Sequence, residues 1–158
     1  MIFLTVGTQL PFDRLVRLID RWAERNPQVK VFAQIGDTDY QPRHFESCTF
    51  LDGEAYASAF KKAEFIIAHA GMGTILSALM AAKPVVVFPR VAALGEHRNE
   101  HQLATCRKLE GLKGCYIAYE DEQLLTLLDN LQGLEGEQIS PYASDQLIDA
   151  IDNFIRQP

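Results

Sequence analysis

The stretch IIAHAGMGTILSAL, residues 66–79, indicates most clearly how this chain folds. An apolar run ends at His69, two glycines follow at Gly71 and Gly73, and helix-forming residues begin at Thr74. A buried strand that passes through a glycine-rich turn into a helix is the repeating unit of parallel α/β sheets. The glycines allow a ligand to approach the backbone closely, and the Thr74 hydroxyl can cap the helix.

The same alternation of strand and helix continues on both sides of this stretch. Short apolar runs predict strands at residues 2–6, 29–35, 48–52, 64–70, 84–89 and 114–119. Helical patterns occupy residues 12–25, 54–62, 74–82, a stretch that ends near 109, 121–131 and 143–156. We therefore predict an α/β fold, a Rossmann-like parallel sheet with helices on both faces, and a single domain over residues 1–158.

Ligands bind such sheets beyond the carboxyl ends of the strands, so the turns that follow the strands are the candidate sites. These turns are VGTQLP (6–11), IGDTDY (35–40), HAGMGT (69–74) and FPRVAALGEHRNEHQ (88–102). The DTD sequence at 37–39 follows a glycine in a turn-rich stretch, where aspartates commonly stabilise the turn itself. We interpret it as a turn and not as a metal site.

The turn HAGMGT suits a phosphate group, because a helix N-terminus offers unpaired N–H groups and the positive end of a dipole. The alternative is a packing turn that holds no ligand. An NAD-type site is disfavoured, because Leu76 stands where a third glycine would be needed. The next strand also ends in Pro89 and Arg90, where such a site needs an acidic residue.

A second polar cluster, GEHRNEHQ, spans residues 95–102 at the predicted start of a helix. Three interpretations are open: a contact with a sugar or base, a solvated helix start, or a metal site. Imidazole and amide groups suit hydroxyl-rich ligands because they both donate and accept hydrogen bonds. His97 and His101 have metal-ligand spacing, but the HEXXH pattern and a third ligand are missing. The candidate residues are Glu96, His97, Asn99, His101 and Gln102.

Composition narrows the class of protein. A formal net charge of −6 disfavours a nucleic-acid-binding role, which needs a basic surface. Three widely spaced cysteines, Cys48, Cys106 and Cys115, predict free thiols. The N-terminal MIFLTVG does not resemble a signal peptide, and no run reaches the ~20 apolar residues of a membrane span. We expect a cytoplasmic protein that another protein must recruit if it acts at a membrane.

One face of the first predicted helix is rich in arginine. Arg14, Arg17, Arg21 and Arg25 follow one another at helical spacing, and acidic residues flank them. A solvated face with local ion pairs is one interpretation, and contact with a partner or with lipid phosphates is the other.

The motifs MIFLTVGTQLPFDRLV, HAGMGTILSAL, KPVVVFPR and NEHQ, in this order, resemble glycosyltransferase family 28 over nearly the whole chain. The resemblance is to the C-terminal, nucleotide-sugar-binding half of these GT-B enzymes, and to stand-alone subunits of eukaryotic N-glycan and bacterial exopolysaccharide synthesis. It implies that two glycine turns and an HQ pair hold the donor. The matching residues are Gly7, Thr8, His69, Gly71, Gly73, Thr74, His101 and Gln102. Ser77 stands where the family often has a glutamate for the ribose hydroxyls, so it implies a weaker contact.

The resemblance further implies the donor-binding subunit of a two-component, metal-independent glycosyltransferase in polysaccharide or glycan synthesis. Such a UDP-sugar-dependent hexosyltransferase would need no cofactor and would act on a lipid-linked acceptor only with a membrane-associated partner subunit, at the cytoplasmic face of the membrane. No catalytic residue is assigned, because the general base would come from the other domain. The alternatives are a non-catalytic nucleotide-binding or regulatory module, which Ser77 favours, and a self-contained nucleotide-sugar epimerase or hydrolase.

Overall fold

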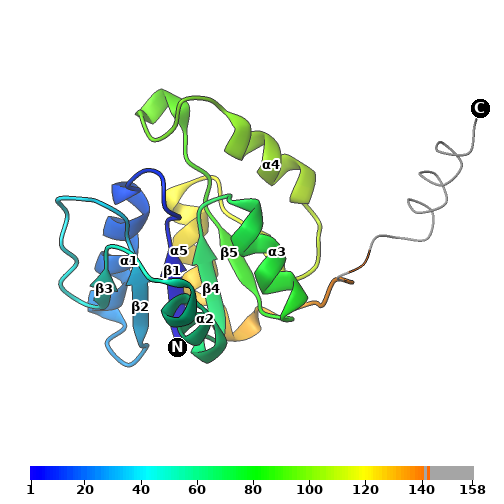
Figure 1. The fold of residues 1–158 in the computed structure, drawn as a ribbon, viewed down its shortest axis with the longest axis horizontal. Helices are drawn as coiled ribbons and strands as arrows, with labels where there is room; N and C mark the ends of the chain where they lie inside the picture. The colour runs from blue at the N-terminus through cyan, green and yellow to red at the C-terminus, as the bar shows by residue number, and fades with distance from the viewer. Residues whose placement is uncertain (141, 143–158) are drawn as a thin grey trace, which may run out of the picture.

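The described part of the chain forms one six-stranded sheet in which all neighbouring strands are parallel (Figure 1). The computed structural model describes residues 1–140 and 142. The strands, in the spatial order β3-β2-β1-β4-β5-β6, are β1 (Ile2–Thr5), β2 (Val31–Gln34), β3 (Glu46–Cys48), β4 (Phe65–Ala68), β5 (Val85–Val87) and β6 (Cys115–Ile117). The described helices are α1 (Asp13–Arg25), α2 (Gly53–Lys62), α3 (Met72–Met80), α4 (His101–Leu109) and α5 (Asp121–Asp129). The predicted Rossmann-like α/β class is confirmed.

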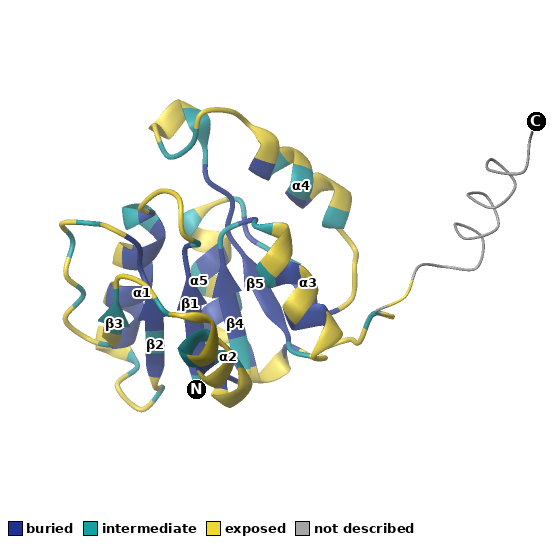
Figure 2. Cartoon of the chain, in the orientation of Figure 1, coloured by how far each residue is buried: buried dark blue, intermediate teal, exposed yellow. Residues whose placement is uncertain are grey.

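Helices cover both faces of the sheet, and the buried residues lie between the layers (Figure 2). Successive residues of a strand point to opposite faces, so Leu4 and Phe3 belong to different apolar clusters. Leu4 shares its cluster with Trp22 of α1 and Leu124 of α5. Phe3 shares the other cluster with Ile75 of α3 and with residues of α2 and α4. Burying each large side chain contributes about 1.5–3 kcal/mol, which explains why the inner strands are apolar on both faces.

The third strand lies earlier than the sequence predicts. β3 covers Glu46–Cys48, whereas the apolar pattern predicted 48–52, and no β3 residue is buried. Phe50, which made the predicted run apolar, is 52% exposed. Asp52 instead caps α2, where its carboxylate accepts a hydrogen bond of 2.8 Å from the Ala55 N–H. An edge strand without buried residues leaves no apolar pattern in the sequence.

The start of α3 also differs from the prediction. The helix begins at Met72, and Gly71 occupies the N-cap position in an extended conformation. Thr74 therefore lies in the first turn, and the prediction that its hydroxyl caps the helix is wrong. The glycine at the cap has no side chain to satisfy the first N–H groups of α3.

Three further expectations concern the rest of the chain. The predicted helix at 143–156 lies outside the described residues. In the described part, no helix combines the length and the apolar character needed to cross a membrane. Cys48, Cys106 and Cys115 are free thiols, as predicted. Burial raises the pKa of Cys106 to about 12 and that of Cys115 to about 11, so both remain unreactive thiols at neutral pH.

Candidate functional site

A cavity of about 590 Å³ opens at the carboxyl ends of β1 and β4. From β1 the strands run outward in sequence order to β3 on one side, and from β4 to β6 on the other. Open α/β sheets bind ligands at such a switch point in the strand order. We call it the sheet-edge cavity. The predicted site residues that line it are Gly7, Thr8, His69, Gly71, Gly73, Thr74, Ser77, His97 and Gln102. The other three predicted residues, Glu96, Asn99 and His101, are not part of its lining.

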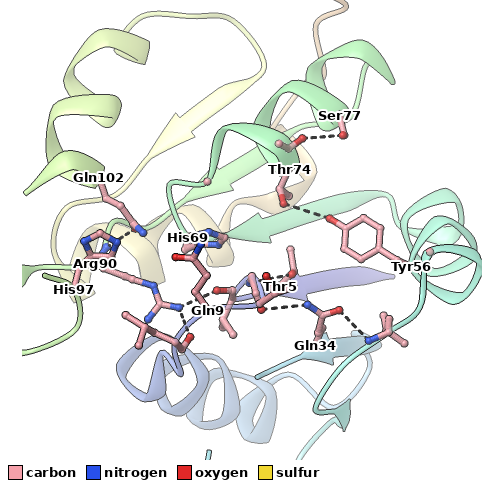
Figure 3. A pocket seen from close by; sticks show the side chains of 18 of the residues that line it. Thr5, Gln9, Gln34, Tyr56, His69, Thr74, Ser77, Arg90, His97 and Gln102 are labelled. Atoms are coloured by element: carbon pink, nitrogen blue, oxygen red, sulfur yellow. Dashed lines mark hydrogen bonds between the residues drawn. The ribbon is translucent and has the colours of Figure 1, made fainter. Parts of the chain in front are cut away.

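His69 lies between the two glycine turns (Figure 3). A Cβ atom on Gly7 would lie 2.6 Å from Cε1 of the His69 ring, and one on Gly71 would collide with its Nε2. Gly7 also has a φ of +81°, which other residues rarely adopt. Both glycines are therefore required by the packing of the imidazole, whatever the cavity binds.

The His69 ring is neutral and one of its nitrogens has no partner. Burial, reinforced by the nearby Arg90 charge, lowers the pKa of His69 to about 4. Its Nδ1 is buried and has no hydrogen-bond partner among the described residues. A buried polar atom without a partner is uncommon in a folded protein. The ring can therefore act only as a neutral hydrogen-bonding group at pH 7.

Gly73 has a different environment from Gly7 and Gly71. No atom lies within 4 Å of where its Cβ would be, and its backbone conformation does not require glycine. Glycine inside a helix costs about 0.5–1 kcal/mol relative to alanine. The packing of the described residues thus gives no reason for this glycine. The open space lies over the uncapped start of α3 and inside the cavity lining, which is the arrangement that lets an anion reach helix N–H groups.

Two hydroxyl groups on α3, those of Thr74 and Ser77, also line the cavity. The Thr74 Oγ1 is 3.3 Å from the hydroxyl oxygen of Tyr56, whose ring packs edge-on against Phe3. The Ser77 hydroxyl donates a hydrogen bond of 2.8 Å to the carbonyl of Gly73, one turn earlier in the helix. The proton of Ser77 is therefore used inside α3, and only its oxygen lone pairs are free to contact a ligand.

Arg90 is a cation buried in the wall of the cavity. Its guanidinium donates hydrogen bonds to the carbonyls of Val6 (2.8 Å) and Leu10 (2.6 Å), and also to that of Pro11. The Phe12 ring centre lies 4.7 Å from its Cζ. Burial lowers the pKa of Arg90 to about 10, so it stays charged at neutral pH. Arg90 thereby fixes the turn after β1, in which Gly7 lies.

Glu96 belongs to an ion pair instead of facing the cavity. Its carboxylate accepts hydrogen bonds from Arg14 at 2.6 and 3.0 Å, and another from the Val91 N–H at 2.8 Å. Arg14 also contacts Asp121 at 3.1 Å and lies over the Phe88 ring. Arg14 is thus a brace between α1 and the loop after β5, which differs from the local ion pairs predicted for this helix face.

The polar cluster 95–102 divides in the structure. The Asn99 Oδ1 accepts a hydrogen bond from the His101 N–H at 3.1 Å and lies 3.1 Å from Nδ1 of His97. Asn99 therefore shapes the loop, His101 is exposed at the start of α4, and His97 and Gln102 reach the cavity. Within residues 1–140 and 142, no group of three His, Cys, Asp or Glu side chains is placed to hold a metal ion.

Several lining residues were not among the sequence candidates, and Gln34, Tyr56 and Arg90 are three of them. Gln34 donates to the Gly7 carbonyl at 3.2 Å and accepts from the Leu51 N–H at 3.1 Å. It therefore connects the turn after β1 to the segment that leads into α2. A polar residue at the carboxyl end of a buried strand was the available signal for Gln34. Arg90, directly after an apolar strand, gave the same signal.

The model of the glycosyltransferase family 28 C-terminal domain matches residues 1–147. The chain belongs to glycosyltransferase family 28. Its motifs were expected to resemble this family, and the match confirms that expectation.

One relative in sequence agrees with this assignment, and two solved structures share the fold. The chain is 31% identical over 118 residues to the human UDP-N-acetylglucosamine transferase subunit ALG13. That alignment covers 68% of this chain, and the chain spans only 10% of the length of that protein. Among solved structures, an NMR structure of ALG13 matches with a TM-score of 0.63 and 17% identity, over 95% of this chain and 93% of the other. MurG of Acinetobacter baumannii matches with a TM-score of 0.56 and 22% identity, over 82% of this chain and 40% of MurG.

Proposed function

We propose that this family 28 domain is the donor-binding subunit of a two-component glycosyltransferase. It would transfer a hexose from a UDP-sugar to a lipid-linked acceptor in polysaccharide or glycan synthesis. The observation that carries the proposal is the open space over Gly73, at the uncapped start of α3 inside the sheet-edge cavity. A diphosphate fits this chemistry because several helix N–H groups can donate to its oxygens at once.

The same geometry favours departure of UDP without a metal ion. When the bond to the sugar breaks, negative charge develops on the diphosphate. Helix N–H groups and the positive end of the α3 dipole stabilise that charge from fixed positions. The buried Arg90 cation in the cavity wall adds to the positive potential.

A partner subunit would complete the site. The cavity is built on the edge of one sheet and is open on its other side, so a second wall has to hold the acceptor. The relative ALG13 is itself described as a subunit of a UDP-N-acetylglucosamine transferase. With a net charge of −6, this chain has little attraction to anionic lipid. A membrane-associated partner would recruit it to the cytoplasmic face, where it meets the lipid-linked acceptor.

Calorimetry with the full chain tests the donor site. UDP and UDP-N-acetylglucosamine should bind equally well with and without EDTA, and ADP serves as the control for base recognition. Absence of binding, or strict dependence on a divalent cation, would contradict the proposal.

A transfer assay tests the partner requirement. The purified chain should transfer no sugar to a lipid-linked acceptor until the membrane protein that co-purifies with it is added. Efficient transfer by the chain alone would rule out the two-component arrangement and favour a self-contained enzyme.

The second candidate function is a non-catalytic nucleotide-binding or regulatory module. Ser77 favours it, because its hydroxyl proton is bonded to the Gly73 carbonyl and the family's usual glutamate is missing. The variant Ser77→Glu should tighten UDP binding about tenfold if a ribose contact is rebuilt, the value of a hydrogen bond to a charged group. If Ser77→Glu leaves affinity unchanged and no partner restores transfer, the regulatory module is the better description.

A further inference from the structure

Two aromatic rings hold Tyr56 in the wall of the sheet-edge cavity. Tyr56 is the fourth residue of α2, and its side chain is part of the cavity lining. Its ring packs edge-on against the fully buried Phe3, with ring centres 5.2 Å apart, and stacks on Phe60 at 6.1 Å. The ring alone makes these contacts, so they fix the position of the Tyr56 hydroxyl without using it.

The Tyr56 hydroxyl meets the first turn of α3, across from α2 (Figure 3). Its oxygen lies 3.3 Å from Oγ1 of Thr74, the residue that directly follows Gly73. A hydroxyl on a helix often bonds back to the carbonyl one turn earlier, as that of Ser77 does. Within residues 1–140 and 142, the hydroxyls of Tyr56 and Thr74 form a hydrogen bond only with each other. They therefore form a pair that bridges α2 and α3.

This hydroxyl pair keeps one proton that it does not use. Each hydroxyl has one proton to donate and can accept two hydrogen bonds. Whichever of the two oxygens is the donor, one proton lies between the two groups and the other can be donated to a ligand. A phosphate oxygen is a strong acceptor for such a proton, because hydrogen bonds to charged groups are shorter and stronger than those between neutral groups.

We propose that Tyr56 belongs to the nucleotide site, where its hydroxyl and that of Thr74 act as one coupled pair that donates a hydrogen bond to the diphosphate. The proposal deepens the proposed function and rests on it. Removing either hydroxyl leaves the other without its partner and free to rotate away, so neither is fully effective alone. Because the ring contacts hold the phenol in place before a ligand arrives, binding costs little side-chain entropy at Tyr56.

A double-mutant cycle tests the coupling. Tyr56→Phe removes one hydroxyl and keeps the ring that packs against Phe3, and Thr74→Val removes the other and keeps the shape of the side chain. Tyr116→Phe is the matched control, because the Tyr116 hydroxyl bonds to the Glu135 carbonyl and does not line the cavity. For each full-length variant, calorimetry gives the dissociation constants of UDP and UDP-N-acetylglucosamine. Displacement of bound UDP gives that of uridine, and thermal unfolding gives the melting temperature.

Each single variant should weaken UDP and UDP-N-acetylglucosamine by the same factor, about tenfold, the equivalent of one hydrogen bond. The double variant should also lose about tenfold, whereas two independent contacts would lose about a hundredfold. Uridine has no phosphate, so its affinity should stay the same in Tyr56→Phe. Tyr116→Phe should leave every dissociation constant unchanged.

Several results would overturn the proposal. Unchanged UDP affinity in Tyr56→Phe would mean that the hydroxyl does not act on the ligand, and a lower melting temperature beside it would assign Tyr56 to packing alone. A hundredfold loss in the double variant would show two independent contacts. Equal weakening of uridine would place the pair at the nucleoside, and weakening of UDP-N-acetylglucosamine alone would place it at the sugar. If uridine does not displace UDP, the cycle decides alone.

The unchanged chain separates this proposal from the one on which it rests. If it binds neither UDP nor UDP-N-acetylglucosamine, the proposed function fails, and the hydroxyl pair has no diphosphate to bind. If it binds either of them, the cycle decides the role of Tyr56, whatever the transfer assay gives.

Discussion

Replacing Gly73 with alanine should stabilise the chain and weaken nucleotide binding at the same time. The position is helical, its φ is ordinary, and no atom lies within 4 Å of the added methyl group. Removing a helix glycine at such a site gains about 0.5–1 kcal/mol. For a chain of this size that corresponds to a rise in melting temperature of about 1–4 °C.

The same methyl group occupies the space through which a diphosphate would approach the start of α3. Loss of one hydrogen bond to a charged group costs about 1.5–3 kcal/mol, so UDP affinity should fall about tenfold to a hundredfold. Calorimetry measures the affinity, and urea denaturation measures the free energy of unfolding. Ser58→Ala is a matched control, because Ser58 is exposed on α2 and does not line the cavity; it should raise stability and leave affinity unchanged.

Either of two results would refute this reasoning. Unchanged UDP affinity in Gly73→Ala would mean that the diphosphate does not reach the start of α3. A loss of stability would mean that the space over Gly73 is filled in solution.

Three other predictions concern stability. Gly71→Ala should lower the free energy of unfolding, measured by urea denaturation, by about 1–3 kcal/mol, because the added Cβ collides with the His69 ring. The double variant Gly71→Ala/His69→Ala should recover part of this lost stability. The pKa of His69 is about 4 in the folded chain, whereas that of an ordinary histidine is 6.5. As the pH falls, His69 is therefore protonated in the unfolded chain before it is protonated in the folded chain. The free energy of unfolding should fall by on the order of 3 kcal/mol as pH drops from 6.5 to 4; a pH series in which His69→Asn falls as steeply would show that other groups cause the loss. Asp20→Asn should cost about 1–3 kcal/mol, because the carboxylate accepts hydrogen bonds from the Tyr40 hydroxyl and from the Arg43 and His44 N–H groups; an unchanged urea midpoint would show that these bonds contribute no net stability.

The buried strands could be predicted from the sequence because burial on both faces leaves continuous apolar runs. Ile66 and Ile67 are fully buried, and the run that contains them ends where β4 ends, near the glycine turn. β3 could not be placed in this way, since its residues are half-buried or exposed at the edge of the sheet. The start of α3 was misplaced because glycine is about as favourable as threonine at a helix N-cap, so residue type alone could not decide between Gly71 and Thr74.

The cavity-lining turns could be predicted from their glycines, but the residues that support them could not. Arg90 bonds to Val6, 84 positions earlier in the chain, and Arg14 pairs with Glu96, 82 positions later. The place of Arg90 after an apolar strand marks it as a candidate, but the sequence does not name its distant partners, and nothing local distinguishes Glu96 from a glutamate in a solvated loop. Glu96 was therefore expected at the ligand, whereas the structure uses it to brace the loop beside the cavity.

The anchoring of the first turn by Arg90 has a thermodynamic and kinetic consequence. Three backbone carbonyls, those of Val6, Leu10 and Pro11, are held by one guanidinium before any ligand arrives. A turn that is already ordered loses little conformational entropy on binding, so association should be fast and should follow single-step kinetics without a slow closing phase. Dissociation rates, and not loop ordering, would then determine how long a nucleotide stays on this chain.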